Sequence, residues 1–576
     1  MDRVTSIQIE QRVRIGLIGA VFLVLFMMVS EKLIEHQIFE YPHWSAAARE
    51  QHTISKTVPA RRGKIFTDEK DDNSLYPLAT NVKLFDLMIV PNQVRQPELV
   101  VSKLMPYLEN VEESVLIEQA SSDKLYIPPL KRKLTEEEAA EIDELNLSGV
   151  YLVPEEYRYF PEETLAAQVL GFVNRDGVGQ YGLEGYFNEE LGGKSGFLEA
   201  ELDTFGQQIA LGKRSTVDPK DGLDLVITID RPLQYYVEKE LKAAVEQYEA
   251  ERGSVIIMDP KTGKVVAMAA YPTFDPNNYN REPIEFFTNM NISQVYEPGS
   301  VFKVVTMASA LDAGLVSPGT TYMDVGEVEV NDRVIRNSDL SAHGLQTMSQ
   351  VLEKSLNTGI VFVVQKLGKN LFNKYLSKFG FFQPTGIELD GEVASNVKGI
   401  RDWSDVDLAT MAYGQGIAVT PIQLVAAVGA IANNGRRVQP HIVDRILYPS
   451  GAVSIDPVIA EEVISPQAAQ LISAMMVNVI EKGHAKAAGV PGYHLAGKTG
   501  TAQMVNPRTG LYYDEDWGTT IHNFIGFGPV EDPQFVMLTR LDKPKNVLYA
   551  AASAAPLFGK IAKFMLDYWR VPPSVL

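Results

Sequence analysis

The stretch Tyr296-Glu297-Pro298-Gly299-Ser300-Val301-Phe302-Lys303 places a candidate nucleophile beside a candidate base. A serine hydroxyl is a poor nucleophile near neutral pH, so a neighbouring group must take its proton. Lys303 follows Ser300 by three positions, and on a helix these two side chains share one face, about one turn apart. Pro298 and Gly299 favour a chain break before that helix, so we expect Ser300 at its positive N-terminal end.

Two further short motifs follow along the chain, Ser355-Leu356-Asn357 and Lys498-Thr499-Gly500. A single Ser-x-x-Lys pair arises by chance in any long sequence, and each of these residues alone would more often be a surface or capping residue. The three motifs in this order form the constellation of the serine acyltransferases that recognise penicillin. With these motifs the chain resembles a class B penicillin-binding protein, a membrane-anchored peptidoglycan D,D-transpeptidase.

The residues around the motifs are more similar to one branch of this family. The stretch 296–303, and Gly414-Gln415-Gly416 followed by Val419-Thr420-Pro421-Ile422-Gln423, look more like the division (septal) branch than the elongation branch. The resemblance covers nearly the whole chain and is strongest from Asp221 onward. It implies an α+β multidomain fold: a single N-terminal transmembrane helix, an elongated non-catalytic pedestal domain, and a penicillin-binding transpeptidase domain in which helices flank an antiparallel sheet, as in serine β-lactamases.

The resemblance also sets the expected domain boundaries. We expect a cytoplasmic tail over 1–14, a transmembrane anchor over 15–34, a class B dimerisation or pedestal domain over 35–220, and the transpeptidase domain over 221–576. The composition agrees with several globular domains, because 45% of the 576 residues are hydrophobic and 22% are charged. A net charge of −20 argues against general affinity for nucleic acid, and the absence of cysteine excludes thiol catalysis, zinc-thiolate sites and disulfides.

The N-terminal apolar stretch predicts a membrane anchor. Residues 15–30 carry no charge and would rise about 24 Å as a helix, against roughly 30 Å for the hydrocarbon core. Leu33 and Ile34 extend the apolar stripe, and no small-residue cleavage site follows, which argues against a cleaved signal peptide. Basic residues precede the span and acidic residues follow it, so the N-terminus is expected in the cytoplasm of a bacterium and the catalytic domain outside. These residues are Arg3, Arg12 and Arg14, then Glu31, Glu35 and Glu40.

Local patterns predict several elements ahead of the nucleophile. Thr135 to Leu145 reads as an acidic helix with a capping box, and Arg231 to Ala250 as an amphipathic helix capped by Asp230. The runs 253–259 and 264–270 read as a hairpin. Its turn contains a second Lys-Thr-Gly, at Lys261, which we interpret as a solvated turn.

The stretch from Gly171 to Tyr186 also resembles the non-catalytic domain of the family. It contains Gly177-x-Gly179-x-x-Gly182, which matches a dinucleotide-binding pattern but lies outside a βαβ unit, so we interpret the glycines as tight turns. Three aromatic residues, Phe172, Tyr181 and Tyr186, are interpreted as packing residues. The stretch Arg61-Arg62-Gly63-Lys64-Ile65 resembles the start of that domain, and we further expect Arg62 to pair with Glu184 and brace it.

The family resemblance assigns a role to each motif residue. Ser300 would attack the carbonyl of the penultimate D-alanine of a stem peptide, and Lys303, if neutral, would accept its proton. Desolvation and a neighbouring cation such as Lys498 would lower the pKa of Lys303 from about 10.4. Ser355 would relay a proton to the departing amine, and Asn357 would hold Lys303 and the substrate amide.

The third motif would hold the substrate and complete the oxyanion hole. The backbone N–H groups of Ser300 and Thr501 would form that hole. Lys498, with the hydroxyls of Thr499 and Thr501, would bind the terminal carboxylate, and Gly500 would let the substrate lie against the strand. No cofactor is expected, and the eight histidines show no metal-binding spacing. His522 is interpreted as peripheral, with a role in substrate choice left open.

Four functions are compatible with these motifs. We favour septal cross-linking, with the elongation-type transpeptidase as the alternative. A β-lactam sensor or scaffold without turnover is disfavoured by the intact motif residues, and a β-lactamase by the anchor and the long N-terminal region. The expected partners are peptidoglycan stem peptides or their lipid-linked precursor, the membrane, β-lactams as inhibitors, a polytopic glycosyltransferase of the shape-elongation-division (SEDS) type, and divisome proteins.

Overall fold

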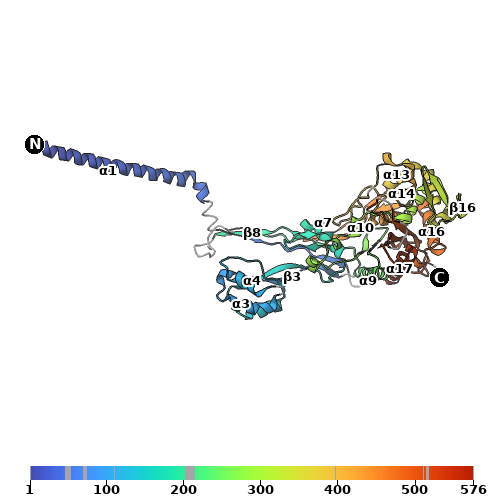
Figure 1. Cartoon of the computed structure of the whole chain (residues 1–576), viewed down its shortest axis with the longest axis horizontal. Coiled ribbons are helices and arrows are strands. Elements are labelled where there is room, and N and C mark those ends of the chain that lie inside the picture. Colours follow the sequence, from blue (N-terminus) through green and yellow to red (C-terminus); the bar gives the residue numbers. More distant parts are fainter. Residues whose placement is uncertain are drawn as a thin grey trace. The chain divides into compact units, whose positions relative to one another are not determined.

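The computed structural model describes residues 2–45, 53–68, 74–108, 111–201, 214–395, 397–506, 508–509, 512–513 and 518–574. The chain forms two compact units. The first contains Met1–Ala60 and Gly193–Asp221, and the second contains Arg61–Gly192 and Gly222–Leu576. Most of the expected pedestal therefore shares a unit with the expected transpeptidase domain. Figure 1 shows the elements along the chain.

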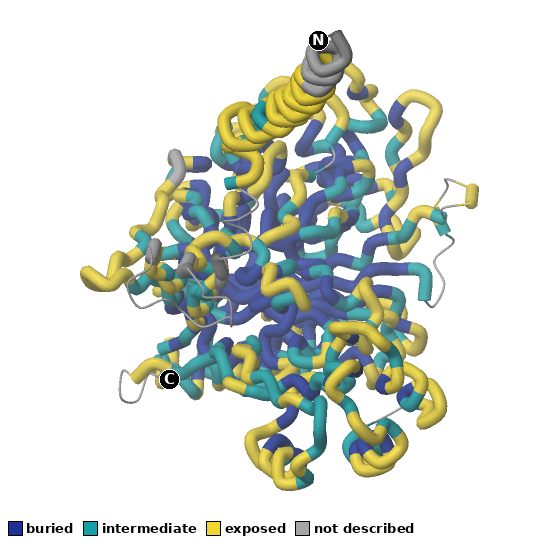
Figure 2. The backbone as a smooth tube through the Cα atoms, turned by 90° about the vertical axis from the view of Figure 1, so that its left-hand side faces the viewer, coloured by how far each residue is buried: buried dark blue, intermediate teal, exposed yellow. Residues whose placement is uncertain are grey.

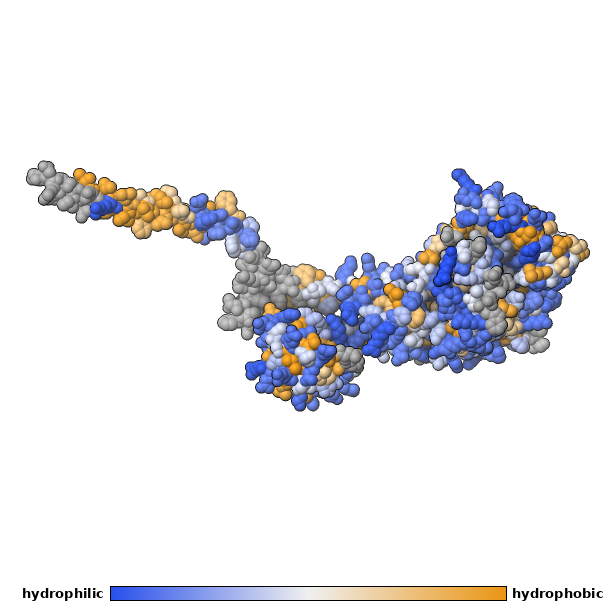
Figure 3. All heavy atoms as spheres, in the orientation of Figure 1, coloured by the Kyte–Doolittle hydropathy of each residue, from blue (hydrophilic) through white to orange (hydrophobic). Residues whose placement is uncertain are grey.

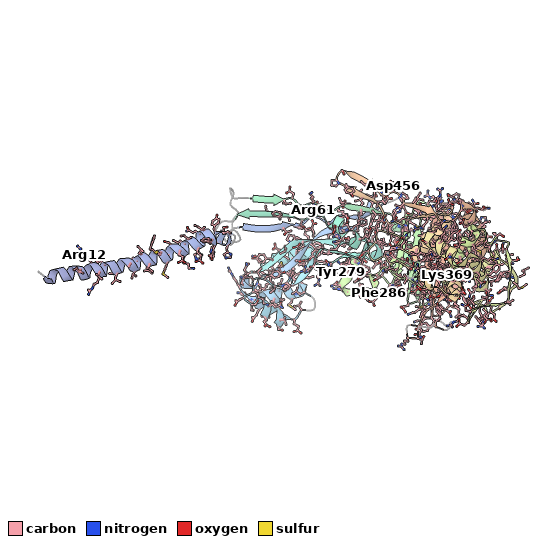
Figure 4. All side chains as sticks on the ribbon, turned by 90° about the horizontal axis from the view of Figure 1, so that it is seen from above. Arg12, Arg61, Tyr279, Phe286, Lys369 and Asp456 are labelled. Carbon is pink, nitrogen blue, oxygen red and sulfur yellow. The ribbon has the colours of Figure 1, made fainter. Side chains whose placement is uncertain are left out.

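The first unit begins with one long helix. Helix α1 spans Asp2–Ile34 and continues as a π-helical turn, η1 (Glu35–Phe39). Within the described residues, this is the one helix that is long and apolar enough to cross a membrane. It begins well before the predicted start at residue 15, so the basic residue Arg12 (Figure 4) also lies on the helix. The apolar stretch is orange in Figure 3, and its side chains are exposed.

A small antiparallel sheet completes the described part of the first unit. Its strand order is β1-β8-β9. The strands are β1 (Thr53–Val58), β8 (Gly196–Glu201) and β9 (Arg214–Val217).

The second unit contains a seven-stranded sheet that joins distant parts of the sequence. Its main path is β19-β18-β10-β2-β3-β4, and β5 also pairs with β3. These strands are β2 (Ile65–Asp68), β3 (Leu75–Ile89), β4 (Lys131–Leu134), β5 (Val150–Tyr159), β10 (Asp224–Ile227), β18 (Val443–Tyr448) and β19 (Gly451–Ser454). The pairing of β2 with β10 is parallel and in register from Ile65 to Thr67. This pairing, and a hydrophobic core shared by residues from Ile65 to Leu566, explain why residues 61–192 belong to the second unit.

Helices cover one part of this sheet. The elements are η2 (Pro91–Gln93), α3 (Pro97–Leu104), η3 (Met105–Tyr107), α4 (Glu113–Ala120) and α5 (Glu136–Glu144). The predicted capping box of α5 is confirmed, because Thr135 and Glu138 bond each other's backbone N–H. Leu104 on α3 and Ile142 on α5 pack with Leu87 and Ile89 of β3 in a separate small core.

A glycine-rich segment follows β5. It contains α6 (Ala167–Leu170), β6 (Phe172–Val173), β7 (Gly179–Gln180), α7 (Gly182–Tyr186) and α8 (Asn188–Gly192). Gly177 and Gly182 have positive φ angles of 78° and 49°, as expected for glycines at turns, whereas Gly179 lies in β7 and its φ is not positive, so the interpretation is wrong for that residue. The strands β6 and β7 form a two-stranded hairpin, and this is not the βαβ unit of a dinucleotide site.

An aromatic cluster packs beside this hairpin. Phe172 stacks on Tyr279 with ring centroids 4.2 Å apart, and Tyr181, Phe274 and Phe287 surround it. Figure 4 labels Tyr279 and its neighbour Phe286. The predicted packing role of Phe172 and Tyr181 is confirmed. The third predicted packing residue, Tyr186, is half exposed and touches Phe187 by its edge.

The catalytic part is built on a five-stranded antiparallel sheet in the order β12-β11-β23-β22-β21. The strands are β11 (Arg252–Met258), β12 (Val265–Tyr271), β21 (Ala496–Gln503), β22 (Thr520–Gly528) and β23 (Phe535–Asp542). The predicted hairpin is confirmed as β11–β12, and Lys261 in its turn is half exposed and pairs with Asp532. Every residue of β22 and β23 is buried, because helices cover both faces.

Two helices, one before the first strand of this sheet and one after its last strand, cover one of its faces. They are α9 (Arg231–Gln247) and α17 (Ala554–Tyr568), which lie side by side in Figure 1. The predicted cap of α9 is confirmed, since Asp230 accepts a bond from Leu233 N, although the helix ends three residues before the predicted end at Ala250. The packed interior is the dark-blue part of the tube in Figure 2.

The opposite face carries the segment around the nucleophile and α15 (Pro421–Ala432). The other elements of this part are η4 (Pro276–Arg281), η5 (Ile284–Phe286), α10 (Met290–Ser293), η6 (Gly299–Phe302), α11 (Lys303–Asp312), α12 (Met348–Glu353), α13 (Asn357–Lys378), η7 (Ile400–Asp402), α14 (Asp405–Ala412), α16 (Pro466–Glu481), η8 (Lys486–Ala488) and η9 (Ala550–Ala552). Three strand pairs complete it: β13 (Thr321–Asp324) with β16 (Gly344–Thr347), β14 (Glu327–Val330) with β15 (Arg333–Arg336), and β17 (Arg436–Val438) with β20 (Ile459–Glu462).

The predicted ion pair between Arg62 and Glu184 is confirmed and has a third member. Arg62 Nε and Arg158 Nε each lie 2.6 Å from a different oxygen of the Glu184 carboxylate. All three side chains are buried or nearly so, with Glu184 wholly inaccessible. Arg158 also donates to Gly63 O, so the cluster ties β5 and α7 to the segment before β2.

Removing the shared carboxylate should destabilise the second unit strongly. In Glu184→Ala, two buried guanidinium groups lose their counter-charge, which typically costs about 3–5 kcal/mol of unfolding free energy. Denaturant unfolding of the purified chain would measure this loss. The matched control is Asp567→Ala, which removes the exposed partner of Lys563 and should leave the unfolding midpoint unchanged. Equal stability of Glu184→Ala and the wild type would contradict a bracing role.

Candidate active site

Ser300 lies in a tight turn that leads into a helix. The turn is η6, and α11 begins at Lys303, so the expected place of Ser300 at a helix start is observed with one turn of 3-10 geometry. Gly299 has a φ of 61°, which favours glycine, and its N–H donates to Gly414 O at 2.9 Å. Ser300 is partly exposed, whereas Gly299 and Val301 on either side are buried.

Lys303 is fully buried and all its recorded bonds go to the second motif. Its Nζ donates to Ser355 O at 2.5 Å and to Asn357 Oδ1 at 2.7 Å, and it lies 3.3 Å from Ser355 Oγ. None of the hydrogen bonds between described residues joins Lys303 to Ser300 Oγ. A neutral amine has two N–H donors and one lone pair, so the two short bonds leave the lone pair for a hydroxyl proton.

The second motif sits at the junction of α12 and α13. Ser355 has a positive φ of 59°, an unusual conformation for serine, which turns the chain between the two helices. Asn357 is the first residue of α13, and its Nδ2 donates to Arg336 O at 2.8 Å. The Asn357 amide therefore bridges the lysine and a neighbouring strand, with its oxygen on Lys303.

Lys498 approaches the same serine from the other side. Its Nζ donates to Ser355 Oγ at 3.0 Å, so one hydroxyl lies between two lysine amines. Burial lowers the pKa of Lys303 well below its ordinary value, and the charge of Lys498 lowers it further. Burial alone lowers the pKa of Lys498 to about 7. Burial and the charge of Lys498 thus both favour the neutral form of Lys303.

The third motif lies on the edge strand of the five-stranded sheet. Because β21 ends the strand order, alternate N–H and C=O groups point away from β22, where an extended peptide can pair with them. A Cβ on Gly500 would lie 2.8 Å from Pro298 O and 3.0 Å from a methyl group of Val301. Glycine is therefore required here by the close approach of the strand to the nucleophile segment.

The two threonines of this strand have different partners. Thr499 Oγ1 lies 3.4 Å from Lys498 Nζ, within the lysine cluster. Thr501 Oγ1 accepts a bond from Ala550 N at 3.1 Å, on η9. One lone pair of the Thr501 hydroxyl is thus committed to the protein.

Hydrogen bonds connect five of the eight residues named from the sequence: Lys303, Ser355, Asn357, Lys498 and Thr499. Ser300 lies about one turn before Lys303. Gly500 lies against Pro298 and Val301, on either side of Ser300. Thr501 joins the group by its backbone: its carbonyl oxygen lies 3.4 Å from where a Gly299 Cβ would be. The structure thus brings the three motifs into one place.

A buried polar network supports the second motif, and sequence reasoning did not find it. Asp324 accepts bonds from Asn337 Nδ2 and Thr358 Oγ1, and Thr358 N donates to Asn337 Oδ1. The network anchors β13 and the end of β15 to the first turn of α13, beside Asn357. Its members are far apart in sequence, and the one local signal was the turn-forming composition around Asn337.

His522 is more deeply placed than a peripheral residue. It is fully buried on β22, directly opposite Thr501. Its ring bonds Thr520 and Ser553, and burial lowers its pKa to about 4, so the imidazole is neutral. Alternation along β22 puts His522 on the face covered by α17 and η9, away from Ser300.

Known families match both parts of the chain. The family described as Penicillin binding protein transpeptidase domain matches residues 253–563, and the Penicillin-binding Protein dimerisation domain matches residues 57–227. Stage V sporulation protein D of Bacillus subtilis is 33% identical over 580 residues, covering 99% of this chain and 88% of that protein. The peptidoglycan D,D-transpeptidase FtsI of Escherichia coli is 31% identical over 450 residues, covering 78% and 73%.

Solved structures give the same result. The crystal structure of penicillin-binding protein 3 from Mycobacterium tuberculosis with aztreonam aligns with a TM-score of 0.69 and 28% identity, covering 90% of this chain and 99% of that chain. A peptidoglycan synthetase from Bifidobacterium adolescentis aligns with a TM-score of 0.70 and 25% identity, covering 91% and 98%. The chain belongs to the class B penicillin-binding proteins and is a penicillin-sensitive peptidoglycan D,D-transpeptidase, which acts on peptidoglycan and binds β-lactams.

Proposed function

We propose that this transpeptidase cross-links septal peptidoglycan through an acyl-enzyme on Ser300. The observation that carries the catalytic part is the hydrogen-bonded path from Lys498 through Ser355 to Lys303, one turn from Ser300. Such a path can remove a proton from one hydroxyl and deliver it to a leaving amine. The septal part is supported by the resemblance of residues 296–303 and 414–423 to the division branch, and by relatives named FtsI.

The first half-reaction forms an ester. Ser300 Oγ attacks the carbonyl carbon of the penultimate D-alanine, and its proton passes to the Lys303 lone pair. The bond from that carbon to the nitrogen of the terminal D-alanine breaks, and the departing amine receives a proton through Ser355. Lys303 is suited to the first transfer because burial and Lys498 keep it neutral. The proton from Ser300 thus ends on the leaving group.

The second half-reaction transfers the acyl group. An amine of a neighbouring stem peptide attacks the ester carbon, the bond from that carbon to Ser300 Oγ breaks, and the amine proton passes to Ser300 Oγ, as in ping-pong kinetics. The N–H groups of Ser300 and Thr501 would stabilise the oxyanion in both steps. Lys498 and the Thr499 hydroxyl would bind the terminal carboxylate, and Thr501 would donate its hydroxyl proton, since the bond from Ala550 N uses only a lone pair of that oxygen. A β-lactam would form the same ester and remain attached.

The membrane arrangement belongs to this proposal as well. Arg12 and Arg14 precede the apolar part of α1 and Glu31, Glu35 and Glu40 follow it, which favours a cytoplasmic N-terminus and an extracytoplasmic catalytic unit. The exposed apolar side chains of α1 offer a surface to a polytopic membrane partner. A SEDS-type glycosyltransferase and divisome proteins are the partners that the family resemblance implies.

Two other roles are distinguished by where the enzyme works. The elongation-type transpeptidase remains the alternative. A sporulation role is favoured by one observation, the 33% identity over 99% of the chain with stage V sporulation protein D. A fluorescent fusion and fluorescent β-lactam labelling in growing cells should both mark midcell. Label along the lateral wall would overturn the septal role in favour of elongation, and label confined to forespores would favour sporulation.

Penicillin should modify one residue. Mass spectrometry of the digested chain after benzylpenicillin treatment should find a single adduct on the peptide that contains Ser300. Ser300→Ala should abolish the adduct, because the proposed ester forms on the Ser300 hydroxyl, one turn before Lys303, whereas the Ser355 hydroxyl is held between the two lysine amines. Ser309→Ala, which removes a buried hydroxyl from α11, the helix that follows Ser300, is the control and should keep the adduct. An adduct that persists in Ser300→Ala would contradict the assignment.

The acylation rate should depend on pH with two limbs. It should rise on the acidic side as Lys303 loses its proton, and fall on the alkaline side as Lys498 loses its own, with a pKa of about 7. In Lys498→Arg the guanidinium stays charged, so the alkaline limb should disappear, although the rate itself should fall because the group differs in shape. Lys261→Arg, in the second Lys-Thr-Gly sequence, is the control and should keep both limbs. Stopped-flow measurement with a fluorescent penicillin gives these profiles, and an alkaline limb retained in Lys498→Arg would refute the role of Lys498.

A further inference from the structure

A row of polar side chains crosses the sheet beneath the nucleophile segment. Gly500, Asn523, Arg540 and Ser254 stand directly opposite one another on β21, β22, β23 and β11. Residues paired in this way project from the same face of a sheet. Gly500 shows that this is the face toward η6, because its Cβ would meet Pro298 O and Val301.

The row holds the backbone just before Ser300 at two points. Asn523 Nδ2 donates to Pro298 O at 3.2 Å. The Arg540 guanidinium lies 4.1 Å from the centre of the Tyr296 ring, which is a cation–π distance in a buried setting. Tyr296 is also fixed by its main chain, which exchanges two 3.0 Å hydrogen bonds with Val419. The three residues before Gly299 are therefore clamped between the sheet and the segment before α15.

This row of buried polar side chains reduces the free energy of unfolding. Arg540 is fully buried, and Asp542 neutralises it through bonds of 2.6 and 2.8 Å. Four polar atoms of this region are buried without a hydrogen-bond partner in the described chain: Arg540 Nη1, Asn523 Oδ1, Tyr296 Oη and Ser254 Oγ. Buried polar atoms left without partners are destabilising, and apolar side chains of similar size would pack at lower cost. A requirement other than stability accounts for polar groups here.

We propose that Asn523 and Arg540 are positioning residues that set the oxyanion hole. This inference rests on the proposed roles of the Ser300 and Thr501 N–H groups. Thr501 lies on β21 and Asn523 on the adjacent β22, so the bond from Asn523 to Pro298 O ties the strand of one N–H donor to the segment that carries the other. Arg540 holds residues 296–298 against the sheet through its contact with the Tyr296 ring. Because Gly500 has no side chain, β21 and the segment before Ser300 can approach each other closely.

The expected effect is on the rate of acylation and not on binding. The negative charge on the oxygen develops in the transition state that leads to the tetrahedral intermediate and is absent from the ground-state complex, so misplacing one donor slows the chemical step while that complex forms as before. A complete loss of one such donor costs about 100- to 1,000-fold in rate. We expect Asn523→Ala to lower the limiting acylation rate constant about 10- to 100-fold, since the donor is displaced but not removed.

The test uses the full chain in detergent and a fluorescent penicillin over a range of concentrations, which separates the limiting acylation rate from the dissociation constant. Asn523→Ala and Arg540→Lys should lower the limiting rate with an unchanged dissociation constant. Arg540→Lys keeps the charge but loses the planar group and its paired bonds to Asp542. Thermal unfolding of each variant is measured alongside.

Two controls separate positioning from general stability. Thr539→Ala removes a buried bond to Ala554 O on the opposite face of β23 and should lower the unfolding temperature without slowing acylation. Tyr296→Phe keeps the ring over Arg540 and should acylate within about twofold of the wild type, whereas Tyr296→Leu loses the cation–π contact and should be slow. The Tyr296 pair tests the inference even if Asn523→Ala fails to fold.

The outcomes are distinct. Wild-type limiting rates in the folded Asn523→Ala and Tyr296→Leu variants would overturn the positioning role. Equal slowing in Thr539→Ala would also overturn it, because the effect would then follow from loosening the sheet. An adduct that forms on a residue other than Ser300 in the wild-type protein would instead overturn the proposed function, whatever the variants do.

Discussion

Two buried lysine amines that share one serine hydroxyl are the constraint on which the rest of the site depends. Lys303 and Lys498 both reach Ser355 Oγ and neither is exposed. Burial disfavours a charge on either amine, and the charge of Lys498 further disfavours a charge on Lys303, so the neutral form of Lys303 is favoured. Burial therefore favours a neutral amine close to a hydroxyl, whereas the same amine in water would stay protonated. Catalysis by an ordinary serine becomes possible for that reason.

Keeping the amines together requires a rigid frame, because their motifs are far apart in sequence. Ser355 and Lys498 follow Ser300 by 55 and 198 positions. The positive φ of Ser355 and the start of α13 at Asn357 fix one wall, and β21 fixes the other. The Asp324 network fixes the first turn of α13 through the hydrogen bond from Thr358. Each wall belongs to an element that packs into the hydrophobic core. The fold therefore sets the distances between the amines and the hydroxyl.

Much of this could be predicted from the sequence where the signal was local. The caps at Thr135 and Asp230, the β11–β12 hairpin and the three motifs all follow from residues a few positions apart, and the structure has the caps and the hairpin. The Arg62–Glu184 pair was found because both residues belong to stretches that resemble the family. The partner Arg158 was missed, since nothing near it in sequence marks it as buried.

What could not be predicted depends on strand register and on tertiary packing. The depth of His522, the partner of the Thr501 hydroxyl, and the inclusion of residues 61–192 in the catalytic unit all depend on which strands become neighbours. Register between β21, β22 and β23 determines which side chains form a row, and a shift of one residue would turn each of them to the opposite face.

The edge position of β21 links the function of this enzyme to a risk that its fold must manage. An edge strand must expose backbone groups to bind a peptide, and exposed edges also pair with other chains. In β21 the face toward η6 holds Lys498 and Gly500: one is charged or polar and the other has no side chain. Both residues are buried, so this face of β21 presents no side chain to a foreign strand. What remains open is the backbone edge of β21, and pairing of a substrate peptide with that edge belongs to the function that we propose.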